Sequence, residues 1–211
     1  MKEYEKAVEY IRKLIVDREL KLGDRLPSER DIAERLGISR NSTREALRIL
    51  DNYGVIGRRH GSGNYMTGNI GGGFSAVMDM ALLLQKTDET EIRDFRRRME
   101  IMVCEMIIDN EEADVEEIGR AALALKDAPE KMKAELDRAF HYKLIDASGN
   151  RLVIMIMKSI SDMYSEWIKE NIHHSNMVTE EKFAGCHIKI YEGLRDRDME
   201  KCLAAVEEHY S

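Results

Sequence analysis

Proline is scarce in this chain, where Pro27 and Pro129 are the only two copies among 211 residues. Aromatic residues are also few, at 6% of the sequence. Because proline interrupts helices, its scarcity removes the strongest obstacle to long helical segments. The composition therefore favours a mainly helical fold.

Long apolar runs and paired cysteines are missing as well. No stretch of about eighteen apolar residues occurs, which argues against a membrane span, and the charged N-terminal segment MKEYEKAVEYIRKL is unlike a signal peptide. The three cysteines, Cys104, Cys186 and Cys202, have no CxxC spacing, which argues against a disulfide framework and a zinc ribbon. We expect a cytoplasmic protein with no membrane partner.

Charge is unevenly divided along the chain. Residues 1–70 contain 14 Lys and Arg against 11 Asp and Glu, whereas the remainder contains 19 against 29, so the net charges are +3 and −10. A basic first part on an acidic remainder predicts that only the first part meets a polyanion. A chance asymmetry is the alternative.

The segment GNIGGG, residues 68–73, has four glycines in six positions. Such a run is typical of a flexible connection, and we expect a linker over residues 70–75. It would divide the chain into two domains, residues 1–69 and 76–211.

The first part has the pattern of a winged helix-turn-helix domain. Apolar residues at helical spacing and capping residues predict helices within residues 3–17, 28–37 and 39–54. Residues 55–67 then read as two short strands around a glycine-rich tip. The short turn LGIS before the third helix fits the helix-turn-helix motif.

The remainder of the chain reads as helix throughout. Its apolar residues recur at spacings of three and four, and short polar or glycine turns separate the segments. We expect an antiparallel bundle of six or seven helices. The predicted fold class is therefore mainly α, with an N-terminal winged helix-turn-helix and a C-terminal all-helical bundle.

The third expected helix carries a row of basic residues. Arg40, Arg44 and Arg48 are four residues apart and share one helical face. The N-terminal residues of a recognition helix enter the major groove, where Arg bonds guanine and Asn bonds adenine, as Asn41 would. Ser39 is placed to donate to phosphate. We interpret this helix as a reader of double-stranded DNA; an exposed, solvated face is the alternative.

Histidines of the second part form a candidate metal site. Asp137 and His141 are four apart on one expected helix, and His187 and His209 lie on the last two helices, 22 residues apart. That interval fits a helix, a turn and a return helix. One carboxylate and three imidazoles suit a divalent transition metal. The alternative is that each histidine is an ordinary core or surface residue.

Residues 20–66 resemble the DNA-binding domain of GntR-family bacterial transcription regulators, through the pieces LPSER, ISRNSTREALRIL and GSGNYM. The resemblance implies DNA contacts from the arginine of LPSER, the start of the third helix and the wing tip. These residues are Arg30, Ser39, Arg40, Asn41, Arg44, His60 and Gly61. Thr43 stands where the family usually has a small apolar residue, and we expect it to pack inward.

Residues 76–211 resemble the helical FCD ligand-binding domain of the FadR-type branch of that family. The matching pieces are RRRME, DRAFHYKLIDASGN, HIKIYEGLRDRD and AAVEEH. Metal-binding members of the branch use the Asp and His of the DRAFH piece and one His from each of the last two helices. The resemblance thus implies the ligands Asp137, His141, His187 and His209.

The same branch often places an arginine against an effector carboxylate, and the resemblance assigns that role to Arg96. A pair with Glu100 on the same helix is the alternative. The neighbouring Arg97 and Arg98 leave open which arginine points inward. The pair His173 and His174 is outside the pattern and is expected at a helix C-terminus, where positive charge is favoured.

These features predict a homodimeric transcription regulator, not an enzyme, that binds a palindromic operator. A small organic-acid effector would bind at a Zn, Ni, Mn or Fe ion and change operator affinity. One alternative is a DNA binder that senses nothing and whose metal is structural. A second is a metalloenzyme that activates water, but no separate general base stands at a recognisable spacing.

Overall fold

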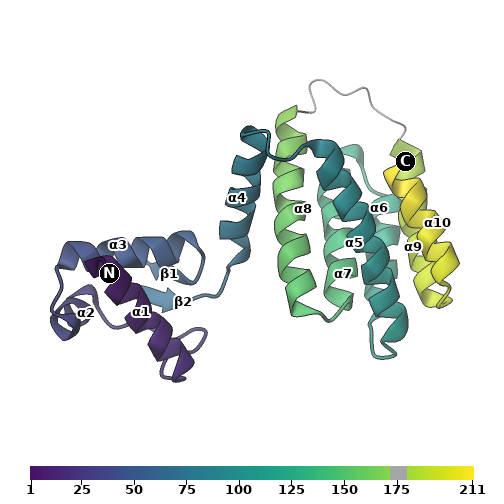
Figure 1. The fold of residues 1–211 in the computed structure, drawn as a ribbon. Coiled ribbons are helices and arrows are strands. Elements are labelled where there is room, and N and C mark those ends of the chain that lie inside the picture. Colours follow the sequence, from purple (N-terminus) through teal and green to yellow (C-terminus); the bar gives the residue numbers. More distant parts are fainter. Residues whose placement is uncertain (172–179) are drawn as a thin grey trace. The chain divides into compact units, whose positions relative to one another are not determined.

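The computed structural model describes residues 1–171 and 180–211. They form two compact units, Met1–Ala76 and Val77–Ser211, each with its own apolar core (Figure 1). His173 and His174 lie outside the described residues. Within the described ranges, no helix is both long enough and apolar enough to cross a membrane.

The first unit is a winged helix-turn-helix. Its elements are α1 (Glu3–Val16), α2 (Glu29–Leu36), α3 (Arg40–Asn52), β1 (Ile56–Arg59) and β2 (Gly63–Met66). The two strands pair antiparallel, with Ile56 opposite Met66 and Arg59 opposite Gly63. The three helices and the wing expected from the sequence are confirmed.

Capping residues explain the tight turn between α2 and α3. The Ser28 hydroxyl accepts from the backbone N–H of Asp31, and the Asp31 carboxylate accepts from the backbone N–H of Ser28. The α2 helix ends at Gly37, whose φ of 63° lies in the left-handed region that glycine favours. Ser39 then caps α3. The apolar faces of all three helices bury into one core.

The part of the chain after the wing is helical, as expected. Its elements are α4 (Gly71–Leu83), α5 (Glu89–Asp109), α6 (Val115–Lys126), α7 (Glu130–Ala147), α8 (Arg151–Asn171), α9 (Glu180–Arg195) and α10 (Met199–Tyr210). These are seven helices in the described part of the chain, within the predicted six or seven. The α9 and α10 helices pack against each other, and α5 and α6 contact this pair.

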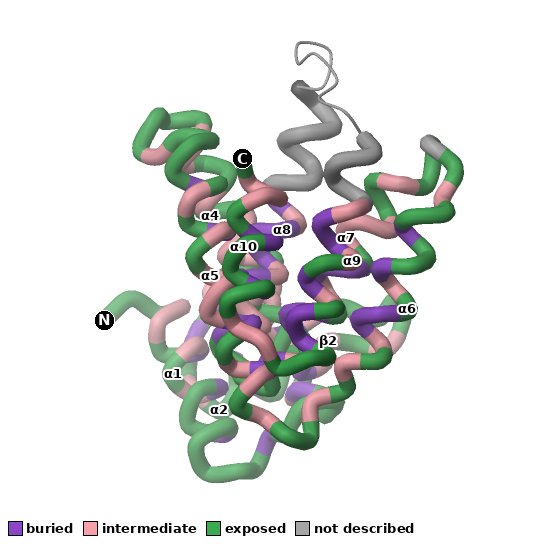
Figure 2. Tube along the Cα trace, turned by 90° about the vertical axis from the view of Figure 1, so that its right-hand side faces the viewer, coloured by how far each residue is buried: buried purple, intermediate pink, exposed green. Residues whose placement is uncertain are grey.

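The core of the second unit draws on α5, α6, α7, α8, α9 and α10, as the buried segments in Figure 2 indicate. Val103, Phe140 and Ile190 are fully buried there. A Cβ at Gly119 would lie 2.5 Å from the ring of Tyr191, so glycine is needed for the close approach of α6 to α9. This packing holds α9, which carries one of the candidate ligands, in the bundle.

The glycine run, which was expected to be an irregular linker, is helical from Gly71 onward. Gly71, Gly72 and Gly73 form the first turn of α4 instead of an irregular connection. The apolar, proline-free sequence that follows extends the helix back into the run. A Cβ at Gly73 would lie 3.1 Å from the Cα of Tyr53, so glycine serves close packing there.

Candidate functional site

The α3 helix presents its basic residues to solvent. Arg40, Asn41, Arg44 and Arg48 are exposed, whereas the opposite face is buried. Thr43 belongs to that buried face, and its hydroxyl donates to the backbone oxygen of Ser39 at 3.2 Å. Thr43 therefore packs inward, as expected.

The start of α3 is tied to the start of α1. The carboxylate of Glu3 accepts from the Ser42 hydroxyl at 2.8 Å and from the Ser39 N–H at 3.2 Å. The Ser39 hydroxyl in turn accepts from the Ser42 N–H at 3.0 Å. Hydrogen bonding from Ser42, followed by that from Ser39, lowers the pKa of Glu3. Glu3 thus anchors the end of the helix that would enter a DNA groove.

Two arginines at or near α3 differ in the distance to their carboxylate partners. Arg44 pairs with Glu29 of α2 at 3.0 Å. Arg30 is exposed and approaches Asp31 and Glu34 only to 3.8 Å. Arg30 is therefore more loosely paired than Arg44.

The wing presents an exposed tip. His60 and Gly61 are both exposed, and Gly61 has a φ of 70°, which favours glycine. Behind the tip, the guanidinium of Arg59 lies 4.3 Å from the centre of the Tyr65 ring. The Tyr65 hydroxyl makes a 2.6 Å hydrogen bond with the Ser62 hydroxyl. Both contacts brace the tip from inside the hairpin.

The second unit brings the predicted histidines together. Ligand atoms of His141 (α7), His187 (α9) and His209 (α10) lie within 4.8 Å of one another. Oδ1 of Asp137 (α7) lies 3.0 Å from Nε2 of His187 and 3.7 Å from Nε2 of His141. All four residues named by the sequence pattern therefore point to one place.

The protonation of this cluster reflects its burial and its charges. Burial lowers the pKa of His209 to about 3, and the charge on His141 adds to that effect. Burial also lowers the pKa of His141, but attraction to Glu100 and Asp137 outweighs it and raises that pKa to about 9. Burial raises the pKa of Asp137, yet attraction to His141 keeps it well below its usual range.

This arrangement fits a divalent transition metal. Neutral imidazole and ionised carboxylate are the forms that bind such ions. Nε2 of His141 is buried and has no hydrogen-bond partner in the described part of the chain, which fits a role as a metal ligand. His141, His187, His209 and Asp137 would hold the metal.

A buried carboxylate from α5 supports His141. Oε1 of Glu100 lies 3.0 Å from Nδ1 of His141 and accepts a 2.5 Å hydrogen bond from the Tyr210 hydroxyl. Burial raises the pKa of Glu100, but the attraction and hydrogen bond to His141, together with the attraction to Arg96 and His209, outweigh burial and lower the pKa to about 2. Glu100 therefore stays ionised and orients the imidazole, as carboxylates commonly do beside metal ligands.

Among the three consecutive arginines of α5, Arg96 points inward. Its side chain is 9% exposed, against 22% for Arg97 and 69% for Arg98. Arg97 and Arg98 pair with Asp94 at the surface. Nη2 of Arg96 lies 3.8 Å from Oε1 of Glu100, the same oxygen that lies 3.0 Å from Nδ1 of His141, so Glu100 links Arg96 to the histidine cluster.

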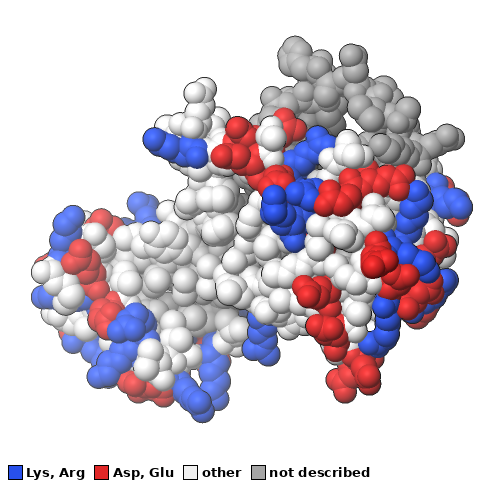
Figure 3. Space-filling model, turned by 45° about the vertical axis from the view of Figure 1, so that its right-hand side comes forward, with Lys and Arg blue, Asp and Glu red and all other residues white. Residues whose placement is uncertain are grey.

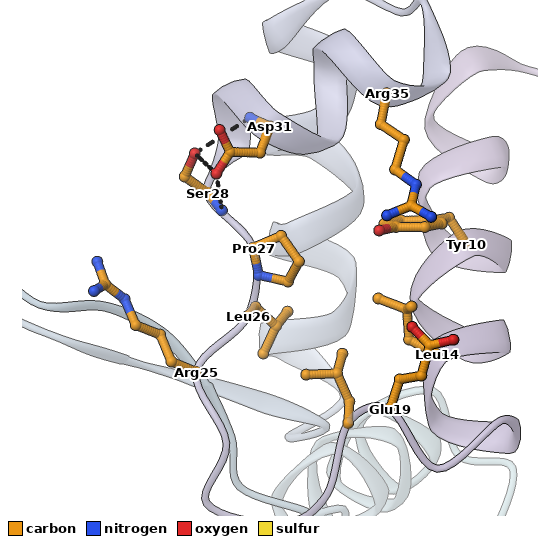
Figure 4. A pocket seen from close by; sticks show the side chains of 10 residues that line it. Tyr10, Leu14, Glu19, Arg25, Leu26, Pro27, Ser28, Asp31 and Arg35 are labelled. Atoms are coloured by element: carbon orange, nitrogen blue, oxygen red, sulfur yellow. Dashed lines mark hydrogen bonds between the residues drawn. The ribbon is translucent and has the colours of Figure 1, made fainter.

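A separate groove of about 530 Å³ lies in the first unit, beside α1 and α2 (Figure 4). Four of the polar residues that line it contact one another in two pairs. Ser28 bonds with Asp31, and the guanidinium of Arg35 lies 5.2 Å from the centre of the Tyr10 ring. We assign no ligand to this groove.

Comparison with known proteins identifies both units. The family described as bacterial regulatory proteins, gntR family, matches residues 3–66, and the FCD domain matches residues 91–211. The chain belongs to the GntR family, in the branch that carries an FCD domain. The resemblance seen in the sequence is thereby confirmed.

Relatives of this GntR protein are transcription regulators. It is 32% identical over 160 residues to the HTH-type transcriptional regulator LutR of Bacillus subtilis, covering 74% of this chain and 73% of LutR. It is 27% identical over 208 residues to the Glc operon transcriptional activator of Escherichia coli, covering 92% of this chain and 80% of the activator. The protein is a DNA-binding transcription regulator and not an enzyme.

A solved structure shares the fold of this GntR regulator. Streptococcus agalactiae GntR superposes with a TM-score of 0.68 at 21% identity, covering 98% of this chain and 97% of that chain. GntR regulators bind DNA and form dimers, and FCD domains bind small-molecule effectors. Acidic side chains are prominent over the FCD unit on the face shown in Figure 3.

Several contacts in this GntR regulator were not predicted from its sequence. Glu3 and Glu29 meet α3 from other helices, and Tyr210 meets Glu100 across 110 residues of sequence. No local spacing signals such contacts. Glu100 was visible only as a possible partner of Arg96, four residues before it, and its contact with His141 was not.

Proposed function

We propose that two copies of this regulator bind a palindromic operator, and that a small carboxylate metabolite at a metal site in the FCD domain changes that binding. The observation that carries the proposal is the convergence of three histidines and Asp137 beside the buried Arg96. A site that joins a metal to a guanidinium suits a carboxylate ligand, because both groups attract carboxylate oxygens.

The DNA-binding part of the proposal uses seven residues of the winged helix-turn-helix. They are Arg30, Ser39, Arg40, Asn41, Arg44, His60 and Gly61. Arg40, Asn41 and Arg44 face solvent on the recognition helix, which supports a role in reading base edges. The others serve the phosphate backbone and the neighbouring groove, and this part of the contact supplies most of the affinity.

The sensing part uses Asp137, His141, His187 and His209 as protein ligands of Zn, Ni, Mn or Fe. When bound, such an ion supplies positions for oxygen atoms of an incoming acid. Four protein ligands leave two positions open on a six-coordinate ion. Arg96 would bind the same carboxylate from the side of α5.

The dimer part is supported by α4. This helix is apolar along most of its length and contains no buried residue, and Val77, Met80 and Leu83 are each more than half exposed. Large exposed apolar surfaces mark interaction sites. We assign α4 to contact with a second copy, since dimers are general in this family.

Control of DNA binding follows if the effector prefers one arrangement of the dimer over another. The free energy of effector binding then shifts the balance between arrangements with high and low operator affinity. Because a DNA-binding regulator must reach its operator, this protein would act in the cytoplasm.

Operator binding in the presence of candidate acids tests the proposal. Metal-loaded protein is titrated into duplexes selected from a random library, with and without a panel of short hydroxy acids and sugar acids. We expect at least one acid to change the affinity for wild type but not for Arg96→Ala, while Arg98→Ala, a change at the exposed neighbour, keeps the response. A protein that holds metal but responds to no acid would instead have a purely structural metal.

A further inference from the structure

The guanidinium of Arg44 is held side-on by one carboxylate. Its Nη2 donates to Oε2 of Glu29 at 3.0 Å, and its Nε donates to the same oxygen at 3.2 Å and to Oε1 at 3.5 Å. Glu29 is the first residue of α2, and Arg44 lies in the second turn of α3. Two-point contact of this kind fixes the plane of the guanidinium as well as its position.

Side-on pairing leaves the other edge of Arg44 available. A guanidinium has five N–H donors, and contact through Nε and one hydrogen of Nη2 leaves the remaining Nη2 hydrogen and both Nη1 hydrogens. Bidentate recognition of guanine uses two such donors at one edge. Arg44 can therefore bond a base while Glu29 still holds it.

Stability does not explain why a carboxylate is placed there. The side chains of Arg44 and Glu29 are 47% and 30% exposed, and exposed ion pairs add little to folding free energy. A negative charge on the surface that approaches DNA also repels phosphate. The Glu29 carboxylate therefore disfavours binding to any duplex in which Arg44 makes no contact with a base.

We propose that Glu29 is a positioning residue that determines the sequence specificity of this regulator. It holds Arg44 in the orientation needed for the groove and prevents it from pairing with phosphates of unrelated sequences. The inference rests on the proposed reading of bases by Arg44. It differs from that proposal because it assigns part of the discrimination to a residue that touches no base.

The test compares two duplexes of equal composition. One is recovered from a random library by selection with the wild-type protein, and the other is its shuffled version. Dissociation constants are measured at fixed salt for wild type, Glu29→Gln, Arg44→Ala and the double variant. Glu34→Gln is the matched control, since it removes the same charge from the same helix and meets Arg30, not Arg44. Thermal melting of each variant verifies folding.

The specificity ratio is the dissociation constant for the shuffled duplex divided by that for the selected duplex. We expect Glu29→Gln to reduce this ratio by about three- to tenfold, the range set by the free-energy cost of ordering one long side chain. Most of the loss should come from tighter binding to the shuffled duplex. Glu34→Gln should shift both constants together. In the Arg44→Ala background, Glu29→Gln should no longer change the ratio.

Three results would overturn the inference. Equal shifts for both duplexes with Glu29→Gln would show that Glu29 only repels phosphate. A loss of discrimination that persists without Arg44 would show that Glu29 reads a base itself. If Arg44→Ala alone left the ratio of the two dissociation constants at its wild-type value, Arg44 would read no base. The inference, which rests on that role, would then be wrong.

Discussion

Oε1 of Glu100 lies 3.0 Å from Nδ1 of His141 in the interior of the FCD unit. The contact determines which imidazole nitrogen carries a proton once a metal is bound, because a carboxylate neighbour favours N–H on the side that faces it. Nε2 is then left for the metal, on the side where Asp137 lies. The candidate metal site would therefore depend on α5 as well as on the three helices that supply its candidate ligands.

Replacing Glu100 by Gln should weaken metal binding without removing a ligand. Supporting carboxylates of this kind typically contribute about 10- to 100-fold in metal affinity. Competition with a chromogenic chelator measures the change. Glu105→Gln, an exposed position on the same helix, is the control and should bind metal as wild type does. Equal metal affinities for Glu100→Gln and wild type would show that Glu100 does not support the metal site.

Loss of a histidine ligand should abolish stable metal binding. We expect about one transition metal per chain in the wild type, the content of a site with one ligand set. His141→Ala and His187→Ala should be metal-free after dialysis, whereas His60→Ala, at the exposed wing tip, should retain the metal. Elemental analysis of the purified proteins measures this content. Metal retained by both ligand variants would contradict the assignment.

Metal binding should release protons near neutral pH. The pKa of His141 in the metal-free protein is raised to about 9, so its imidazole is protonated at pH 7.5 and must lose that proton to bind metal. His209, with its pKa lowered to about 3, is already neutral. Affinity should therefore rise with pH up to about 9, by as much as tenfold per pH unit for one proton.

Titration calorimetry in buffers of different ionisation enthalpy counts the released protons. A value near one at pH 7.5 would agree with displacement from His141. A value near zero would mean that the metal-free imidazole is already neutral, and the charge balance between His141, Glu100 and Asp137 would need another explanation.

Removal of the Arg44 side chain should weaken specific DNA binding by about 1–3 kcal/mol, the range for one bidentate base contact. Fluorescence anisotropy with a selected duplex measures the loss. Arg12→Ala is a control, because Arg12 lies on α1 and pairs with Glu9 of the same helix. Unchanged affinity in Arg44→Ala would refute the assignment of α3 as the reading helix.

The winged helix-turn-helix was predictable because its signals are local. Ser28 and Ser39 cap helices within three residues, Gly37 ends one, and a glycine-rich tip between two short segments marks the wing. The histidine cluster was predictable for a similar reason. Asp137 and His141 share a face through their spacing, and the 22-residue interval between His187 and His209 fits a helix, a turn and a return helix. The family resemblance then implied all four as candidate ligands.

Contacts between distant elements were not predictable in this way. Tyr210 reaches Glu100 across 110 residues, and the pair between Glu29 and Arg44 depends on how α2 packs on α3. The helical conformation of the glycine run was not predictable for another reason. Glycine is compatible with both a flexible connection and a helix, and close packing beside Tyr53 uses its lack of a side chain in the helical form.

The candidate ligands come from three different helices, α7, α9 and α10. An ion bound to all three would stabilise the folded chain in proportion to the logarithm of its free concentration over the dissociation constant. A chain that lacks the ion would unfold and meet proteases more often. The number of regulator molecules in a cell would then follow the supply of metal, independently of how fast the gene is transcribed.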